Sequence, residues 1–185
     1  MKDSFIIFNN ENFQGTNVSA IVDCTITPTN APSGSFSSKM SFYSGKYKRY
    51  CIIIEVVVNS VTGTACFVSE GEPGASHDMR LLKKTSDDIN SMLNGTKLIG
   101  DKGFKGIQSL IPNGFVPTES PLLENRCLVD PYFGRLKTVY AFAREKYNKD
   151  TVIYDDLITL CCCFCNVDIG INPLINVDQT NYKNI

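Results

Sequence analysis

Lys97-Leu-Ile-Gly-Asp-Lys-Gly-Phe104 is the stretch of sequence that decides how we interpret this chain. Apolar residues run directly into Gly100 and then into the carboxylate of Asp101, which predicts a strand that delivers an acid to the edge of a sheet. The neighbouring glycines tolerate positive φ and let the backbone approach a ligand closely. Asp101 is therefore a candidate metal ligand, and the alternative is a β-turn whose Asp bonds to its own backbone.

Length and composition predict a single globular domain. The 185 residues are 43% hydrophobic, which is enough to bury a core without disulfides or metal. The 18 Lys and Arg against 19 Asp and Glu give a net charge of -1, so any binding to nucleic acid must be local or assisted by a partner. The sequence contains no run of 18 apolar residues and does not begin as a secretory signal does, which argues against a membrane partner.

Four of the eight cysteines crowd together at Cys161, Cys162, Cys163 and Cys165. Adjacent cysteines rarely pair with one another, and the chain has no export signal, so we expect reduced thiols in an intracellular compartment. A zinc site is the alternative. Because tetrahedral zinc sites normally use two separated pairs of ligands, the cluster is more typical of an apolar helix.

The order of predicted elements indicates an α/β fold with three layers, a mixed central sheet flanked by helices. Residues 51–58 are almost continuously apolar, which predicts a strand that helices cover on both faces. In the first half of the chain we expect a strand within residues 4–22 that ends before Asp23, a polar loop at 28–41, and a hairpin of 51–58 and 64–68. A helix at 79–93 and the strand before Asp101 follow. The rest is expected to form an irregular segment at 105–125 with a short turn of helix, helices at 125–146 and 153–165, and a docked tail.

Three acids lie at the ends of these elements. Asp23 and Asp101 each follow a predicted strand, and Asp130 begins a predicted helix. Carboxylates from neighbouring strand ends and from a facing helix can bind a pair of hard divalent cations. Two such metals, about 3.5–4 Å apart, activate a water and stabilise the leaving oxygen of a phosphodiester. The pattern therefore indicates a nuclease, although Asp residues at strand ends without a catalytic role are common.

Basic residues accompany two of these elements. Arg126, Asp130 and Lys137 have the spacing of one helix face, where the cations can support a metal-binding acid and grip a phosphate. An ordinary salt-bridged surface is the alternative. A basic stripe continues along residues 126–149, and we expect it to face phosphate groups. A second basic stretch precedes residues 51–58. It either contacts phosphate groups or is the solvent-exposed start of a strand without a binding role. The candidate DNA contacts from these two stretches are Lys46, Lys48, Arg49, Arg126, Arg135 and Lys137.

Five blocks of sequence then occur in a characteristic order. They are Asp23-Cys-Thr25, Tyr43-Ser-Gly-Lys-Tyr-Lys-Arg-Tyr50, Glu72-Pro-Gly-Ala-Ser-His-Asp78, Gly100-Asp-Lys-Gly-Phe104 and Arg126-Cys-Leu-Val-Asp-Pro-Tyr-Phe-Gly-Arg-Leu-Lys137. With these blocks the chain resembles, over about residues 18–176, the DDE endonuclease domain of PIF/Harbinger-type transposases and their insertion-sequence relatives. The resemblance implies an RNase H-like fold for a single domain that spans residues 1–185.

The resemblance also implies DNA strand cleavage and transfer that use Mg²⁺ or Mn²⁺. Asp23 and Asp101 match the first two metal ligands, and the third acid of the family pattern falls on Asp130, where relatives have Glu. His77 and Asp78 match a further motif that positions DNA or the metal site, so Asp78 is an alternative ligand and His77 a further candidate DNA contact. Asp is one methylene shorter than Glu, and Pro131 behind it suits a helix that Asp130 caps instead.

Relatives place a helix-turn-helix segment before the catalytic domain, whereas here the first acid arrives at Asp23. We therefore expect no N-terminal DNA-binding domain, and a separate DNA-binding partner protein that brings the chain to transposon ends or target DNA, with an oligomer allowed. The expected location is the nucleus of a eukaryote, or otherwise the cytoplasm. The alternatives are a domesticated or decayed transposase that binds DNA or protein without cleavage, and a general intracellular nuclease.

Overall fold

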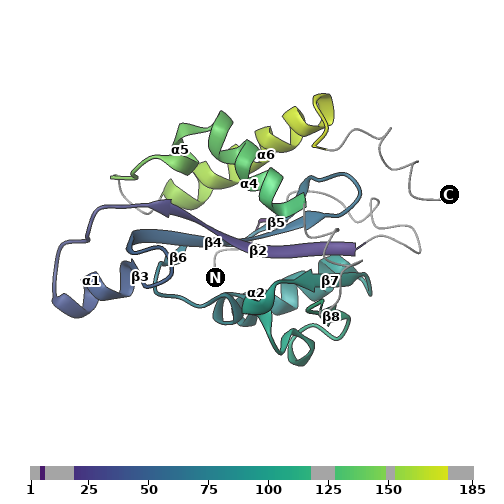
Figure 1. The fold of residues 1–185 in the computed structure, drawn as a ribbon, viewed down its shortest axis with the longest axis horizontal. Coiled ribbons are helices and arrows are strands. Elements are labelled where there is room, and N and C mark those ends of the chain that lie inside the picture. The colour runs from purple at the N-terminus through teal and green to yellow at the C-terminus, as the bar shows by residue number, and fades with distance from the viewer. Residues whose placement is uncertain (1–4, 7–18, 118–127, 149–152, 175–185) are drawn as a thin grey trace.

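A curled mixed sheet forms the centre of the computed structural model, which describes residues 5–6, 19–117, 128–148 and 153–174 (Figure 1). Helices lie on both sides of this sheet, so the predicted α/β class agrees with the observed architecture. Arg126, Lys149 and most of the segment expected as a strand in residues 4–22 lie outside the described residues.

Two long strands carry the sheet. β2 (Ser19–Pro28) and β4 (Arg49–Asn59) run antiparallel, from Ala20 opposite Asn59 to Pro28 opposite Cys51. The β-branched residues of β4 favour this extended pairing. The sheet order is β1-β5-β4-β2-β7-β8, with β3 and β6 paired to β4. The shorter strands are β1 (Phe5–Ile6), β3 (Tyr43–Ser44), β5 (Ala65–Val68), β6 (Glu72–Pro73), β7 (Lys97–Gly100) and β8 (Gly114–Phe115).

The sheet changes from antiparallel to parallel at β2. On one side, β4 and then β5 pair in antiparallel fashion, and on the other side β7 and then β8 run parallel to β2. The parallel strands need a crossover connection, which α2 (Asp78–Leu93) helps to provide. The end of β7 at Gly100 therefore lies beside Val22, in the middle of β2, although the two strands are far apart in the sequence.

Alternating side chains of the strands build two cores. Ile21, Ile54 and Val56 pack beneath α4 (Val129–Val139), α5 (Ala141–Arg144) and α6 (Tyr154–Ile171). Val22 and Ile53, which point to the opposite face, pack against α2. Figure 1 shows α4, α5 and α6 on one side of the sheet and α2 on the other. The strict alternation of these strand residues separates the two helical layers.

Several local predictions are confirmed. The hairpin of β4 and β5 forms, and α2 ends at Asn94 and Gly95, whose φ angles of 44° and 87° are left-handed. A short helical turn, η3 (Ile107–Ser109), occurs in the segment expected to be irregular. The four clustered cysteines lie in α6 as free thiols, with Cys162 and Cys165 buried. The cluster therefore belongs to a packed helix, as the composition indicated.

Four local predictions are wrong. The polar segment 28–41 contains part of α1 (Phe36–Phe42), whose N-cap Ser35 accepts a bond from Ser38 N at 3.2 Å. The helix expected over 125–146 breaks at Tyr140, which is extended, into α4 and α5. Asp130 is not the N-cap of α4, because the helix already begins at Val129. Asp23 does not end a strand, because the pairing of β2 with β4 continues to Pro28.

No helix among the described residues combines the length and the apolar character that crossing a membrane requires.

Candidate functional site

Asp23 lies inside β2, at the place where the sheet changes direction. Its backbone is opposite Val56 of β4, and the last registered pair between β2 and β7 is Val22 with Gly100. Asp101 is the next residue after Gly100, so both acids follow the same registered pair. The Asp23 side chain is half-buried, and its Oδ1 accepts a bond from Cys24 N at 2.7 Å. The parallel register thus sets Asp23 beside Asp101.

Asp101 follows β7 and also caps a short turn. It is the N-cap of η2 (Lys102–Phe104), and its Oδ1 accepts a bond from Gly103 N at 2.7 Å. The turn that was the alternative interpretation is therefore present. It does not exclude a role in binding, because the same turn fixes the carboxylate at the end of a central strand.

Asp78 approaches Asp101 from the first turn of α2. A β-carbon built at Gly103 would lie 2.5 Å from Asp78 Oδ2 and 2.8 Å from Asp101 Oδ1. Both carboxylates therefore crowd the same glycine. The positive end of the helix dipole favours an acid in the first turn. We call Asp23, Asp78 and Asp101 the carboxylate cluster.

Lys46 is the cation beside this cluster. It lies in the turn between β3 and β4, which the bond from Lys48 N to Ser44 O closes at 2.8 Å. Lys46 Nζ is 3.9 Å from Asp78 Oδ2 and 5.4 Å from the centre of the Tyr47 ring. Lys48 is exposed on the same turn, and Arg49 is exposed at the start of β4. Of the three candidate DNA contacts in this segment, Lys46 is therefore the one that lies beside the acids.

The acids of the cluster influence one another electrostatically. The pKa of Asp23 is raised to about 6, mainly because the carboxyl is buried; the bond from the Cys24 amide acts to lower this pKa, and the charges of Asp101 and Asp78 contribute to its rise. Lys46 opposes this rise in the Asp23 pKa. One lysine beside three acids leaves an excess of negative charge when all three are ionised. Such a site attracts cations.

Carboxylate oxygens are the ligands that Mg²⁺ and Mn²⁺ prefer, and the repulsion within the cluster is of the kind that a divalent cation relieves. In this respect the residues fit a metal. In the described ranges, however, no group of three or more His, Cys, Asp or Glu side chains is already arranged to hold one. The Oδ1 atoms of Asp23 and Asp101 both accept backbone bonds instead. Metal binding would therefore require these side chains to reorient.

Asp130 lies on a different element from the cluster. It is exposed in the first turn of α4, whose other side packs Val129, Tyr132, Phe133 and Leu136 into the core. Within the part of the chain that the structure describes, no hydrogen bond or ion pair joins Asp130 to the carboxylate cluster. The charges that act on the Asp23 pKa are those of Asp101, Lys46 and Asp78.

The remaining candidate DNA contacts are spread over the molecule. His77 is exposed at the N-cap of α2, directly before Asp78. Arg135 forms an ion pair with Asp168 of α6 and donates to Asn172 O at 3.2 Å. Lys137 is half-buried, and burial lowers its pKa. The structure thus brings Lys46 to the acids, while His77 only precedes Asp78 in the chain and Arg135 connects α4 to α6.

Glu55 is a buried acid that the sequence interpretation missed. It lies opposite Cys24 in β4 and is 0% exposed, and its Oε2 accepts a bond from Thr85 Oγ1 at 2.6 Å. The pKa of Glu55 is raised to about 8, mainly because the carboxyl is buried; the Thr85 bond acts to lower this pKa, and the charge of Asp78 contributes to its rise. A single acid within the apolar run 51–58 was the signal that could have identified it.

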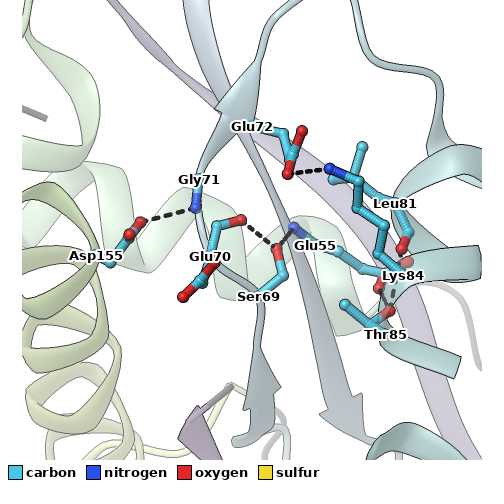
Figure 2. A network of polar contacts seen from close by, with 9 residues as sticks. All are labelled: Glu55, Ser69, Glu70, Gly71, Glu72, Leu81, Lys84, Thr85 and Asp155. Carbon is cyan, nitrogen blue, oxygen red and sulfur yellow. Dashed lines mark hydrogen bonds and ion pairs between the residues drawn. The ribbon is translucent and has the colours of Figure 1, made fainter. Parts of the chain in front are cut away.

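Glu55 belongs to a network of hydrogen bonds that connects α2 and α6, one from each helical layer, to β4 and to the residues that follow β5 (Figure 2). Ser69 Oγ accepts a bond from Glu55 N at 2.8 Å and donates to Glu70 O at 2.9 Å. On the next residue, Gly71 N donates to Asp155 Oδ1 of α6 at 2.7 Å. Thr85 of α2 completes the connection through the Glu55 carboxyl group. The network helps to fix α2, and with it Asp78, against β4.

The model of the DDE superfamily endonuclease family matches residues 22–166, a range that includes the whole carboxylate cluster, Lys46 and Asp130. Neither the curated proteins nor the solved structures contain a match.

Proposed function

Because this chain belongs to the DDE superfamily endonuclease family, we propose that it is a metal-dependent DNA endonuclease of the transposase type that cleaves phosphodiester bonds by a two-metal-ion mechanism. One observation carries this proposal. Asp23 and Asp101 follow the same registered pair of two parallel strands, and Asp78 approaches from α2. Carboxylates from three separate elements in one place are an arrangement that suits divalent cations and phosphodiester chemistry.

The ligands in this proposal are Asp23 and Asp101, with Asp78 as the third acid that the geometry supports and Asp130 as the third acid of the family pattern. Bound Mg²⁺ or Mn²⁺ supplies a water of lowered pKa and positive charge at the scissile phosphate. The Asp23 carboxyl, with its pKa of about 6, is mostly ionised at neutral pH and available as a ligand. Lys46 is placed to attract the phosphate backbone and to balance part of the negative charge.

The finer assignments to the PIF/Harbinger type and to an RNase H-like fold are also proposals. Four of the five sequence blocks supply residues to the proposed site, namely Asp23, Lys46, Asp78, and Asp101 with Gly103. The antiparallel strands β5, β4 and β2 are continued by the parallel strands β7 and β8 between two layers of helices, and this arrangement supports the fold assignment.

DNA is the proposed substrate, either as transposon ends or as target. We propose that Lys46, Lys48, Arg49 and His77 contact the backbone near the scissile bond, and that Arg126, Arg135 and Lys137 extend the contact. With a net charge of -1, the chain gains little from long-range attraction, so a separate DNA-binding protein is the proposed partner. In a eukaryotic cell the proposed location is the nucleus, where this substrate is found.

A second function, DNA or protein binding without cleavage by a domesticated or decayed transposase, is favoured by Asp130. This residue is Asp where relatives have Glu, and in the described part of the chain it has no bond to the cluster. The two functions predict different results in one assay.

The assay measures nicking of supercoiled plasmid with Mg²⁺ or Mn²⁺, and DNA binding by mobility shift. The proposed function predicts metal-dependent nicking by the wild type, its loss in Asp101→Asn, and its retention in Asp87→Asn, a matched control on the exposed side of α2. Nicking that Asp101→Asn leaves unchanged would contradict the proposed site. DNA binding without nicking in the wild type would support the second function.

A further inference from the structure

The helix α1 buries none of its own residues. All seven remain at least partly open to solvent, although a helix this short depends on packing for most of its stability. Phe36, at its start, is 78% exposed, and Met40, one turn later on the same face, is 40% exposed. Phe36 is the most exposed large hydrophobic side chain in the part of the chain that the structure describes. An apolar pair on an uncovered helix indicates a surface that binds a partner.

Two connections hold α1 beside the carboxylate cluster. Ala75 N, three residues before Asp78, donates to Ser41 O at 2.9 Å. β3 follows α1 directly and pairs with the start of β4, and the turn between these strands carries Lys46, whose Nζ is 3.9 Å from Asp78 Oδ2. Figure 1 shows α1 at the margin of the molecule, beyond the end of β2 and the start of β4. The rise of a helix places Phe36 about 8 Å beyond Ser41. α1 therefore projects from the edge of the site.

The segment that contains α1 is basic. Between residues 24 and 54 the sequence has no acid, whereas the whole chain has a net charge of -1. The cations of this segment are Lys39, Lys46, Lys48 and Arg49. Lys46 faces the cluster, but among the described residues no ion pair involves the other three. Glu72 of the neighbouring β6 is already paired with Lys84. The surface thus combines free positive charge with an exposed aromatic ring.

We propose that α1 is a DNA-contacting element in which Phe36 stacks on a base of an unpaired or distorted strand, while Lys39, Lys48 and Arg49 hold the phosphates. The inference rests on the proposed function, because it takes DNA as the molecule at the carboxylate cluster. A nucleic-acid strand presents both phosphates and flat apolar rings, which a basic surface with an aromatic side chain fits. Paired and stacked bases hide these rings, so stacking requires an unpaired or distorted strand.

The position of the segment favours DNA over an acidic protein as the molecule that covers α1. The basic segment extends from α1 to Lys46, and Lys46 is beside the acids at which the scissile phosphate must lie. A strand that is bound at the cluster therefore passes along residues that are already basic. An acidic protein on α1 would block this path.

DNA binding in EDTA tests the inference separately from cleavage. Fluorescence anisotropy compares a short duplex with the same duplex that contains a central bubble of unpaired bases, and the wild type should bind the bubble more tightly. Phe36→Ala should weaken binding to the bubble about 10-fold and to the duplex less than about twofold, because it removes one stacked base. Phe36→Trp should retain or strengthen the binding. Phe164→Ala, the same change at a 53% exposed residue of α6, is the matched control and should bind as the wild type does.

The basic residues should respond differently from Phe36. Lys48→Ala should weaken binding to both probes by a similar factor and reduce its dependence on salt, because a phosphate contact is lost. Phe36→Ala should leave the salt dependence unchanged. Lys83→Ala, which removes an exposed lysine of α2, is the control for the loss of one charge.

The results separate this inference from the proposed cleavage. A wild type that binds neither probe, or a Phe36→Ala variant that binds the bubble as the wild type does, would overturn the inference even if the wild type nicked plasmid. Binding that depends on Phe36, without nicking, would support the inference and contradict the endonuclease function. If Phe36→Ala instead dissociated a dimer in sedimentation velocity and left DNA binding unchanged, α1 would be a protein interface and the inference would be wrong. Circular dichroism checks that each variant folds.

Discussion

Asp23 and Asp101 are the first residues beyond Val22 and Gly100, the last registered pair between the parallel strands β2 and β7. The charge of Asp101 raises the pKa of Asp23, so the two carboxylates interact across the sheet. The carboxyl end of β7 thus lies beside the middle of β2, and the carboxyl ends of parallel strands are where binding sites in α/β folds commonly form. This relationship is the basis of the predictions below.

The identity of the third acid is the first prediction. Asp78→Asn should lower the affinity for Mn²⁺ about 10-fold or more, because it removes a negative ligand from the carboxylate cluster. Asp130→Asn should change the affinity by less than about twofold if Asp78 supplies the third ligand. Isothermal titration calorimetry with Mn²⁺ measures both variants.

The opposite ranking of these two variants would assign the third ligand to Asp130. In that case Asp130→Glu, which restores the residue of the relatives, should maintain or raise metal-dependent nicking. If Asp130→Glu abolished nicking while Asp130→Ala did not, Asp130 would have no ligand role.

A methyl group at Gly103 should disturb the carboxylate cluster. In Gly103→Ala the new β-carbon would lie within 2.8 Å of both Asp78 Oδ2 and Asp101 Oδ1, so at least one carboxylate must move. We expect Mn²⁺ affinity to fall by about 10-fold, in the range that displaced ligand-supporting groups show. Gly134→Ala is the matched control, because its β-carbon meets nothing within 4 Å and alanine favours a helix. Equal metal affinity in Gly103→Ala and the wild type would argue against this site.

Lys46 should compete with metal for the carboxylate cluster. Its Nζ lies 3.9 Å from Asp78 Oδ2, and its charge lowers the pKa of Asp23. Lys46→Ala should therefore raise Mn²⁺ affinity by about threefold, a small effect because the lysine is exposed, while weakening binding to DNA. Lys83→Ala, an exposed lysine on α2, is the control. A loss of metal affinity in Lys46→Ala alone would show that the lysine orders the acids instead of competing for them.

Glu55 should make the folded state less stable as the pH rises. Its pKa is raised from 4.5 to about 8, so between these values the unfolded chain releases a proton that the folded chain retains. The free energy of unfolding should therefore fall through this window and level off above it. Glu55→Gln cannot ionise and should be more stable than the wild type at pH 8.5 by about 1–4 kcal/mol.

Urea unfolding at pH 5 and pH 8.5 measures this effect, with Glu145→Gln, a change at the exposed residue that follows α5, as a control. The difference between variant and wild type isolates Glu55 from other titrating groups such as Asp23. A pH dependence that is the same in Glu55→Gln and the wild type would contradict the raised pKa.

Local sequence determined most of the secondary structure. The β-branched run of β4, the Asn94-Gly95 end of α2 and the apolar repeat of α6 each act over a few residues, so their periods and turn residues were sufficient. The break at Tyr140 and the helix at Phe36–Phe42 were missed because no proline or glycine marks the first and a polar composition hides the second. Short-range signals are weak at such boundaries.

The sequence by itself determined which acids to consider, the family that they resemble, and the strand that presents Asp101. Only the tertiary structure decided that Asp23 lies within its strand, that Asp78 and Lys46 join it, and that Glu55 is buried below α2. The physical reason is that these relationships depend on strand register and on the packing of α2 across the sheet. Both are set by contacts between residues distant in the chain, which no local pattern contains.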